Sequence, residues 1–311
     1  MRLNSRKIAI FGAGGTGAQT ARTLGLMGLE EIALVDIDGA LAEAMALDLS
    51  QTTALTGKAC RFYGGNDTSL CRDAAIVIVT AGVGRKPGIK REQMLTDNAH
   101  VIQQIADAVL RYASDAFVII LTNPADLLAR YFQAYTGWSS NRIVAQGGIL
   151  DSARLSTAIA TTLHIDVRDV RSMVLGAHGD LMVPLMSASS VHGVPASTLL
   201  SREEWARIVE ETRFGGNAIL HRLKTRGASL TPGLAVAQMA LALSRPTPYL
   251  LPISCASTGA FGLPSVVYLG LPALLSNRGV EKVLSIPLTR DEQAALTVSA
   301  RQLDAAYGAL A

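Results

Sequence analysis

The sequence is poor in charged residues and has no membrane-spanning or nucleic-acid-binding pattern. Asp, Glu, Lys and Arg make up 17% of its 311 residues, below the roughly one quarter of typical soluble domains, and the mean hydropathy is +0.30. Five prolines interrupt the longest charge-free run, residues 246–277, so we expect no lipid-spanning helix. The net charge of +3 comes without a Lys/Arg block, which argues against nucleic acid as a partner. We expect the weakly charged surface to form subunit contacts.

Cysteine is also scarce, and no metal-binding pattern is built from it. Cys60, Cys71 and Cys255 are scattered, without C-x-x-C spacing or a paired histidine. Such an odd set is typical of reduced thiols rather than of disulfides or a zinc site. The first apolar run begins within about seven residues of Met1, with no apolar signal core or transit-like extension. We therefore expect a cytoplasmic protein without a metal site.

A glycine-rich stretch near the N-terminus is the strongest pattern that the sequence does contain. An apolar run over residues 8–11 passes directly into Gly12-Ala13-Gly14-Gly15-Thr16-Gly17, a G-x-G-x-x-G motif. Between a strand and a helix, Gly12 allows a tight turn, Gly14 lets a pyrophosphate approach and Gly17 lets the helix pack closely. The helix N-terminus adds free N–H groups for the phosphates. This stretch predicts a dinucleotide-binding site.

An acidic residue follows at the distance that such a site requires. The apolar run over residues 31–35 ends in Asp36, nineteen residues after Gly17. We expect its carboxylate to accept a hydrogen bond from an adenosine ribose hydroxyl and to repel a 2′-phosphate. No arginine directly follows Asp36. The predicted cofactor is therefore NAD rather than NADP.

Apolar runs alternate with helical patterns over the first 145 residues. Further strands are expected near residues 60–63, 75–80, 117–121 and 142–145. This alternation predicts an α/β fold, with a Rossmann-type doubly wound parallel sheet in a domain spanning residues 1–145. The pattern then changes to helices, hairpin-like segments and a strand over 170–176. We expect residues 146–311 to form a mixed α+β catalytic domain.

Several polar residues follow the predicted strands, where ligands of doubly wound sheets bind. Asp36 and Asn123 should therefore line one crevice with Gly12. Asn123 precedes Pro124, so ordinary turn chemistry is the simplest interpretation, and a hydrogen bond to a substrate oxygen is the functional one. Arg85 and Arg91 lie in and just after a loop with three glycines. They are either solvated side chains or part of a lid over the crevice.

Two segments of the second half carry the candidate catalytic groups. Asp151 and Arg154 are three residues apart near the start of a predicted helix, so they share a helix face. His178 follows an apolar strand and precedes Gly179. A surface ion pair and a structural histidine are the simple interpretations. The catalytic interpretation is a carboxylate that orients a histidine, beside an arginine that binds an anionic substrate in bidentate fashion.

In this order, five blocks resemble the lactate/malate dehydrogenase family over nearly the whole chain. They are the glycine-rich stretch with Asp36, Arg85-Lys86-Pro87-Gly88 with Arg91, Thr122-Asn123-Pro124, Leu150-Asp151-Ser152-Ala153-Arg154, and Gly176-Ala177-His178-Gly179-Asp180. The resemblance implies that His178 donates or accepts the proton and that Asp151 is its carboxylate partner. The cofactor-binding residues that it implies are Gly12, Gly14, Gly15, Thr16, Gly17, Asp36, Asn98 and Asn123.

The resemblance also implies how the substrate is bound. Arg91 would polarise the substrate carbonyl, Arg154 would hold the α-carboxylate, and Asn123 would contact the substrate. Arg85 stands where malate enzymes of the family carry arginine and lactate enzymes commonly carry glutamine. It would bind the second carboxylate of oxaloacetate, and pyruvate would leave it unpaired. Residues 180–185 and 224–225 also resemble the malate branch, whereas Ala177, Leu181 and residues 226–230 depart from it.

The resemblance therefore implies reversible hydride transfer between malate and NAD, the reaction that gives oxaloacetate and NADH in the tricarboxylic acid cycle. A homodimer or homotetramer is expected. Two alternatives stay open. The first is the same chemistry on lactate or another 2-hydroxy acid, and the second is a non-catalytic NAD-binding or redox-sensing protein. The four retained groups His178, Asp151, Arg91 and Arg154 argue against the second.

Overall fold

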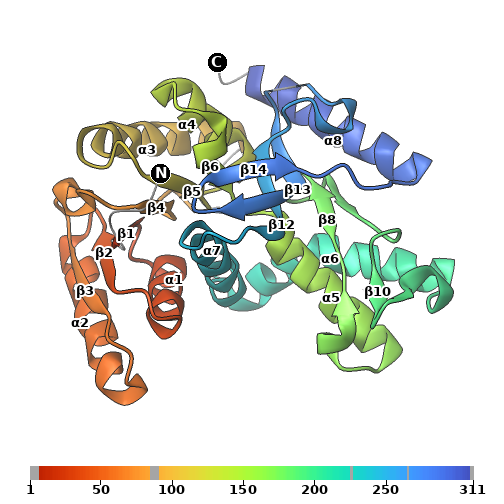
Figure 1. Cartoon of the computed structure of the whole chain (residues 1–311), viewed down its shortest axis with the longest axis horizontal. Helices are drawn as coiled ribbons and strands as arrows, with labels where there is room; N and C mark the ends of the chain where they lie inside the picture. Colours follow the sequence, from red (N-terminus) through yellow and green to blue (C-terminus); the bar gives the residue numbers. More distant parts are fainter. Residues whose placement is uncertain (1–6, 85–90, 225–226, 265, 309–311) are drawn as a thin grey trace.

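One long β-sheet runs from the N-terminal half of the chain into the C-terminal half (Figure 1). The computed structural model describes residues 7–84, 91–224, 227–264 and 266–308. In order across the sheet the strands are β3 (Arg61–Gly65), β2 (Glu31–Val35), β1 (Lys7–Phe11), β4 (Ile76–Val79), β5 (Phe117–Ile120), β6 (Ile143–Ala145), β12 (Tyr249–Ala256), β13 (Tyr268–Ser276), β8 (Val174–Gly176) and β9 (Met182–Pro184), with β14 (Gly279–Val283) paired to β13.

The first six strands of this order are parallel and form the doubly wound sheet that the sequence predicts. The strand order 3-2-1-4-5-6 is that of a dinucleotide-binding fold. Every residue of β4 and β5 is buried, because helices cover both faces of a parallel sheet. The helices of this half are α1 (Gly15–Leu26), α2 (Gly39–Thr56), α3 (Arg91–Tyr112) and α4 (Ala125–Thr136), with 3-10 turns η1 (Thr68–Cys71) and η2 (Ser140–Arg142).

The two ends of helix α2 have clear local causes. The Asp38 side chain accepts a hydrogen bond from the Leu41 N–H at 3.1 Å and caps the first turn. At the other end Gly57 adopts a left-handed conformation with φ of +65°, which stops the helix. The cap and the glycine therefore set the boundaries.

The C-terminal half is mixed α+β, as expected. Its helices are α5 (Gly148–Leu163), α6 (Arg202–Leu223), α7 (Leu230–Leu243) and α8 (Arg290–Gly308), with 3-10 turns η3 (Val167–Asp169), η4 (Ala196–Thr198) and η5 (Ala260–Gly262). A second sheet contains β11 (Val194–Pro195), β10 (Ser190–Val191) and β7 (Val170–Arg171).

The prediction of one strand over residues 170–176 was wrong. Those residues form β7 in the small sheet and β8 in the long sheet. The interruption has a polar cause, because Ser152 of α5 binds the chain between the two strands. The Ser172 hydroxyl donates to the Ser152 carbonyl at 3.0 Å, and the Val174 N–H donates to the Ser152 hydroxyl at 2.9 Å.

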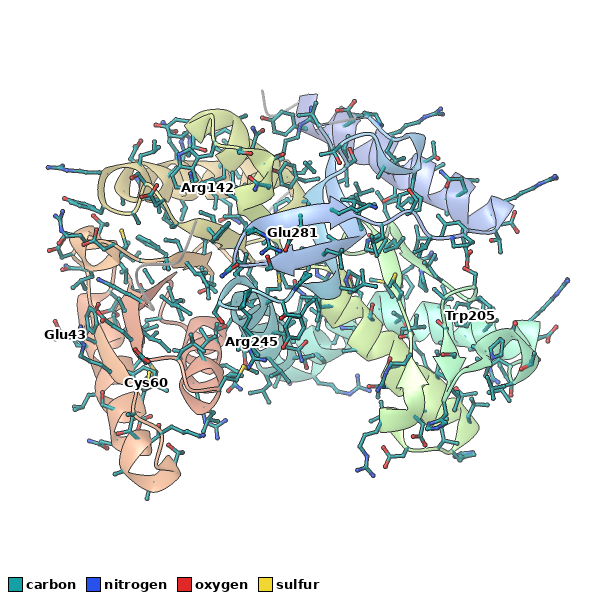
Figure 2. All side chains as sticks on the ribbon, viewed as in Figure 1. Glu43, Cys60, Arg142, Trp205, Arg245 and Glu281 are labelled. Carbon is teal, nitrogen blue, oxygen red and sulfur yellow. The ribbon has the colours of Figure 1, made fainter. Side chains whose placement is uncertain are left out.

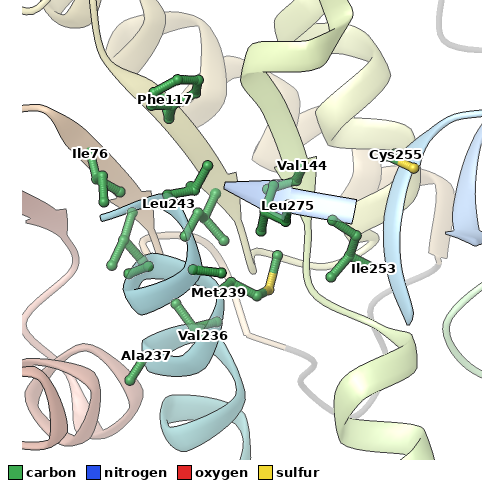
Figure 3. Packing of buried hydrophobic residues seen from close by; sticks show 14 of the residues in the cluster. Ile76, Phe117, Val144, Val236, Ala237, Met239, Leu243, Ile253, Cys255 and Leu275 are labelled. Carbon is green, nitrogen blue, oxygen red and sulfur yellow. The ribbon is translucent and has the colours of Figure 1, made fainter. Parts of the chain in front are cut away.

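The two halves share a core. Ala145 of β6 pairs with Ser254 of β12, which continues the sheet across the predicted boundary. Helix α7 packs against α1 and on the sheet (Figure 1), and its residue Gly233 lies close to Gln19 of α1. Figure 3 shows side chains of α7, including Met239, beside strand residues of the same buried cluster. The boundary near residue 145 stays a prediction.

The three cysteines are free, as expected. Cys71 and Cys255 are buried, and Cys60 lies in the N-terminal part of the ribbon beside α2 (Figure 2). Burial raises the pKa of the Cys60 and Cys71 thiols to about 11 and that of Cys255 to about 12. These thiols therefore carry little thiolate, the nucleophilic form, at neutral pH.

Candidate active site

The glycine-rich turn connects β1 to α1 in the conformation that the motif requires. Gly12 has a φ of +105°, which a side chain would disfavour. A Cβ atom on Gly17 would overlap the Gly12 carbonyl oxygen, whereas a Cβ on Gly14 would meet nothing within 4 Å. The turn thus needs Gly17 for its own packing and leaves open space at Gly14. This difference fits a backbone that a pyrophosphate approaches at Gly14.

We expect the two glycines to respond differently to alanine. Gly17→Ala should lower the melting temperature, because the new Cβ forces the turn and α1 apart, with a destabilisation of about 1–3 kcal/mol from overpacking. Gly14→Ala, at a φ of −66°, should fold normally but bind NADH more weakly. Thermal unfolding and NADH fluorescence titration measure the two effects. Equal melting temperatures for the two variants would contradict this assignment.

Asp36 lies at the end of β2, next to the glycine-rich turn. One carboxylate oxygen accepts a hydrogen bond from the Ala13 N–H at 2.7 Å, and the other accepts one from the Asp38 N–H at 3.0 Å. These bonds fix the carboxylate beside the turn, where a ribose of a dinucleotide bound to the turn would lie. The open space at Gly14 and the fixed carboxylate at Asp36 together fit NAD.

His178 and Asp151 form a close pair, although 26 residues separate them. Asp151 lies in the first turn of α5 and is 1% exposed. His178 follows β8 in a loop, between Gly176 (φ +80°) and Gly179 (φ +115°). The distance from His178 Nδ1 to Asp151 Oδ2 is 2.8 Å. With Nδ1 bound to the carboxylate, Nε2 is the nitrogen left to exchange a proton with a substrate.

The surroundings of His178 favour its protonated form. Burial of the ring disfavours the imidazolium, but the charge of Asp151 and its hydrogen bond outweigh burial, and the pKa of His178 is raised above 6.5. The charge of Asp126 acts in the same direction, and Arg154 opposes it. A histidine with a raised pKa is a suitable proton donor near neutral pH.

Arg154 lies beside the pair, one turn further along α5. Its Nη1 is 3.2 Å from Asp151 Oδ1, so the two oxygens of Asp151 are shared between the arginine and the histidine. Gly215 and Gly216 of α6 face the guanidinium, and a Cβ on Gly216 would lie 3.2 Å from Arg154 Nη2. The glycines therefore leave room for the guanidinium next to the imidazole. The sequence alone did not indicate this role for the two glycines.

Asn98 lies in α3 and its side chain reaches the loop after β4, whereas Asn123 follows β5. Asn98 is 1% exposed; its Oδ1 accepts a hydrogen bond from the Val83 N–H at 2.6 Å, and its Nδ2 donates one to the Asn123 carbonyl at 2.7 Å. Asn98 thus connects the two loops that border the crevice. Asn123 itself is exposed. A contact of either residue with the cofactor stays a prediction.

Two predicted substrate residues cannot be compared with the structure. Arg85 lies outside the described residues, as does the side chain of Arg91, although α3 begins at that residue. Over the described ranges, no group of three or more His, Cys, Asp and Glu could hold a metal ion. Within the same ranges, the helices are too short or too polar to cross a membrane.

The chain is similar to proteins of one family along its full length. The model of the lactate/malate dehydrogenase NAD binding domain matches residues 6–145, and that of the alpha/beta C-terminal domain matches residues 149–308. Malate dehydrogenase from Anaplasma marginale is 38% identical over 98% of each chain. Malate dehydrogenase from Geobacillus thermodenitrificans is 37% identical over 96% of each chain.

Solved structures have the same fold. Malate dehydrogenase from Cryptosporidium parvum superposes with a TM-score of 0.94 and 32% identity over 100% of this chain and 99% of its own. Lactate dehydrogenase from Cryptosporidium parvum, complexed with lactic acid and nicotinamide adenine dinucleotide, gives 0.93 and 32% over 98% of each chain.

A doubly wound half with a dinucleotide-binding turn, joined to a histidine paired with a buried aspartate, defines an NAD-dependent oxidoreductase. The chain belongs to the lactate/malate dehydrogenase family. The fold does not choose between the two substrates, because a malate and a lactate dehydrogenase superpose almost equally well.

Proposed function

We propose that this chain is an NAD-dependent malate dehydrogenase, which interconverts malate and oxaloacetate. The observation that carries the proposal is the pair of half-buried His178 and buried Asp151, at 2.8 Å, with Arg154 3.2 Å from Asp151. These groups provide a proton donor and an anion-binding arginine next to the NAD-binding half. The similarity to malate dehydrogenases at 36–38% identity over 92% or more of the chain supports the substrate.

His178 donates the proton during reduction and accepts it during oxidation. During reduction its Nε2 donates a proton to the carbonyl oxygen of the substrate, which becomes the hydroxyl of the product. Asp151 keeps the ring oriented through Nδ1 and stabilises the imidazolium before the transfer. During oxidation the neutral imidazole accepts the hydroxyl proton at the same nitrogen, so one residue serves both directions.

Arginines hold the substrate. Arg154 pairs with the α-carboxylate, in a position fixed by Asp151 on one side and by the glycines of α6 on the other. Arg91 polarises the carbonyl and stabilises the oxyanion, and Asn123 donates a hydrogen bond to the substrate. Arg85 binds the second carboxylate of the dicarboxylate substrate. These roles together orient a 2-oxo acid toward His178.

The carboxyl edge of the parallel strands would hold the cofactor. Residues 12–17 and the N-terminus of α1 would bind the pyrophosphate, and Asp36 would bind the adenosine ribose. Asn98 and Asn123 border the nicotinamide end. When bound, NAD accepts a hydride from the hydroxyl-bearing carbon of the substrate, and NADH returns it.

The direct test is NADH oxidation, followed by absorbance, with oxaloacetate and pyruvate in parallel. We expect strong preference for oxaloacetate. Preference for pyruvate would keep the chemistry and assign the chain to the lactate branch, with Leu181 and residues 226–230 as the first places to examine. NADH binding without turnover of any 2-oxo acid would instead support a non-catalytic NAD-binding protein.

Arg85→Gln should change the choice of substrate. Loss of the guanidinium removes a charge-assisted bond to the second carboxylate, worth about 1.5–3 kcal/mol. This predicts a decrease in kcat/KM for oxaloacetate of about ten- to a hundredfold, with a smaller effect or a gain for pyruvate. Arg85→Lys keeps the charge without the planar fork and serves as the matched variant. An unchanged ratio of the two kcat/KM values would remove Arg85 from substrate selection.

We also propose that the protein is a cytoplasmic homodimer or homotetramer. Helix α2 exposes Leu41, Leu47 and Leu55, and α6 exposes Phe214, Ile219 and Leu223. Clusters of exposed large apolar side chains are typical of protein interfaces, and the low charge content agrees. Light scattering of the purified chain measures the mass; a monomer would contradict the proposal.

A further inference from the structure

A second buried carboxylate lies beside the His178–Asp151 pair. Asp126 is in the first turn of α4, two residues after Pro124, and is 4% exposed. Its Oδ2 accepts a hydrogen bond from the backbone N–H of His178 at 2.9 Å. The bond connects the N-terminal half to the loop that carries the histidine. The proposed mechanism gives Asp126 no other role, although burying a carboxyl group is costly without partners.

The other carboxyl oxygen of Asp126, Oδ1, has Ser254 of β12 as its neighbour. The Ser254 hydroxyl lies close enough to the carboxyl group to lower its pKa. Among the described residues, Asp126 Oδ1 and Ser254 Oγ are nevertheless both buried without a hydrogen bond of normal geometry. Two adjacent buried polar atoms of this kind are best satisfied by each other.

The position of Ser254 explains why it can support Asp126. Ser254 pairs with Ala145 of β6 on one side and with Gly270 of β13 on the other. Gly270 in turn pairs with Gly176, two residues before His178. The four residues form one row across the sheet. Asp126 thus contacts the His178 backbone directly and, through Ser254, the strand row that leads to it.

We propose that Asp126, supported by Ser254, is a positioning residue that holds the backbone of His178 for proton transfer. The inference rests on the proposed role of His178 as the proton donor. Asp126 is three residues after Asn123, on the same short segment that borders the nicotinamide end of the crevice. It therefore fixes the separation between the nicotinamide site, from which the hydride comes during reduction, and the proton donor, because the two act on adjacent atoms of one carbonyl group.

The proposed positioning acts through this hydrogen bond, whereas the charge of Asp126 acts separately by raising the pKa of His178. Burial raises the pKa of the Asp126 carboxyl, while Ser254 and the His178 N–H lower it in part; the charge of Asp151 raises it further. The Oδ2 atom of Asp126 accepts the bond from the His178 N–H at 2.9 Å. Asparagine keeps an accepting side-chain oxygen for this bond and adds an amide that can donate to Ser254 Oγ. Asp126→Asn should therefore preserve the position of His178, and Asp126→Ala should not.

The test compares the wild-type protein with Asp126→Ala, Asp126→Asn and Ser254→Ala in single-turnover oxidation of NADH by oxaloacetate. Because the donor is misplaced, we expect the single-turnover rate constant of Asp126→Ala to fall by about ten- to a hundredfold. The amplitude of the NADH signal, which reports the fraction of active protein, should stay at the wild-type value. Asp126→Asn should stay within about threefold of wild type, because it keeps the bond, and Ser254→Ala should fall in between. The matched control is Asp304→Ala, whose carboxylate contacts Arg130 of the same helix α4 on the surface.

Hydrogen exchange of the His178 amide measures the bond without turnover. We expect exchange about tenfold faster in Asp126→Ala and near the wild-type rate in Asp126→Asn. A reduced amplitude with an unchanged rate constant in Asp126→Ala would mean only a loss of folded protein and would overturn the inference. So would equal damage by Ala and Asn, or unchanged exchange in Asp126→Ala. If wild type oxidises no NADH, the proposed function fails, and the exchange data alone decide whether Asp126 holds His178.

Discussion

His178→Asn should lower kcat for oxaloacetate reduction by about a hundred- to ten-thousandfold, the usual contribution of a positioned proton donor. Asparagine has no group that can donate a proton to the alkoxide at neutral pH, so the transition state loses its acid. The dissociation constant of NADH should change little, because the glycine-rich turn and Asp36 are in the other half of the chain. Steady-state kinetics and NADH fluorescence measure the two quantities separately.

An exposed histidine gives the matched control for this variant. His192 has a side chain 89% exposed, 3.8 Å from Asp169, and a φ of +47° that asparagine tolerates well. His192→Asn should therefore leave kcat unchanged. If His178→Asn also kept normal turnover, His178 would not be the proton donor and the proposed mechanism would be wrong.

Asp151→Asn should have the second-largest effect and should also move the pH dependence. The variant loses the carboxylate that orients the ring and favours its charged form, so kcat for reduction should fall by about a hundredfold or more. It also removes the main influence that raises the pKa of His178 against burial. The pKa of His178 should therefore decrease.

The direction of the pH shift follows from the proton that each reaction needs. Reduction requires protonated His178, so its rate is high below the pKa and falls as the pH rises through it. Oxidation requires the neutral ring, so its rate rises through the same pKa. In wild type both midpoints should lie above the ordinary value of 6.5; in Asp151→Asn both should move to lower pH. Asp169→Asn, in the exposed pair with His192, should move neither midpoint, and unmoved midpoints in Asp151→Asn would contradict its role.

The doubly wound half could be predicted well from sequence because its signals are local. Except for β3, its strands are short apolar runs, and the parallel arrangement itself places the residue that follows each strand at the carboxyl edge of the sheet. The parallel sheet and the place of Asp36 at the end of β2, beside the glycine-rich turn, agree with the prediction. Helix spacing likewise predicted that Asp151 and Arg154 share a face of α5, and they are 3.2 Å apart.

The features that sequence reasoning missed depend on contacts between distant segments. The break between β7 and β8 follows from hydrogen bonds to Ser152, about twenty residues earlier. The role of Gly215 and Gly216 depends on the guanidinium of Arg154 across a helix interface. Asp126 looked like an ordinary first-turn acidic residue of α4. In the sequence its natural partner is Arg130, four residues later on the same helix, but in the structure Arg130 pairs with Asp304 and Asp126 binds the His178 backbone.

The return of α7 to the N-terminal half limits how the protein can be divided. Helix α7 packs against α1 and joins the buried cluster that contains β4 and β5 residues such as Ile76 and Phe117. A fragment ending near residue 145 would uncover this apolar face and also leave the edge of β6 unpaired. Uncovered faces and free strand edges promote self-association. We therefore expect an isolated dinucleotide-binding fragment to aggregate. A soluble fragment would need a replacement helix that covers the apolar face bound by α7, and polar residues that block pairing at the edge of β6.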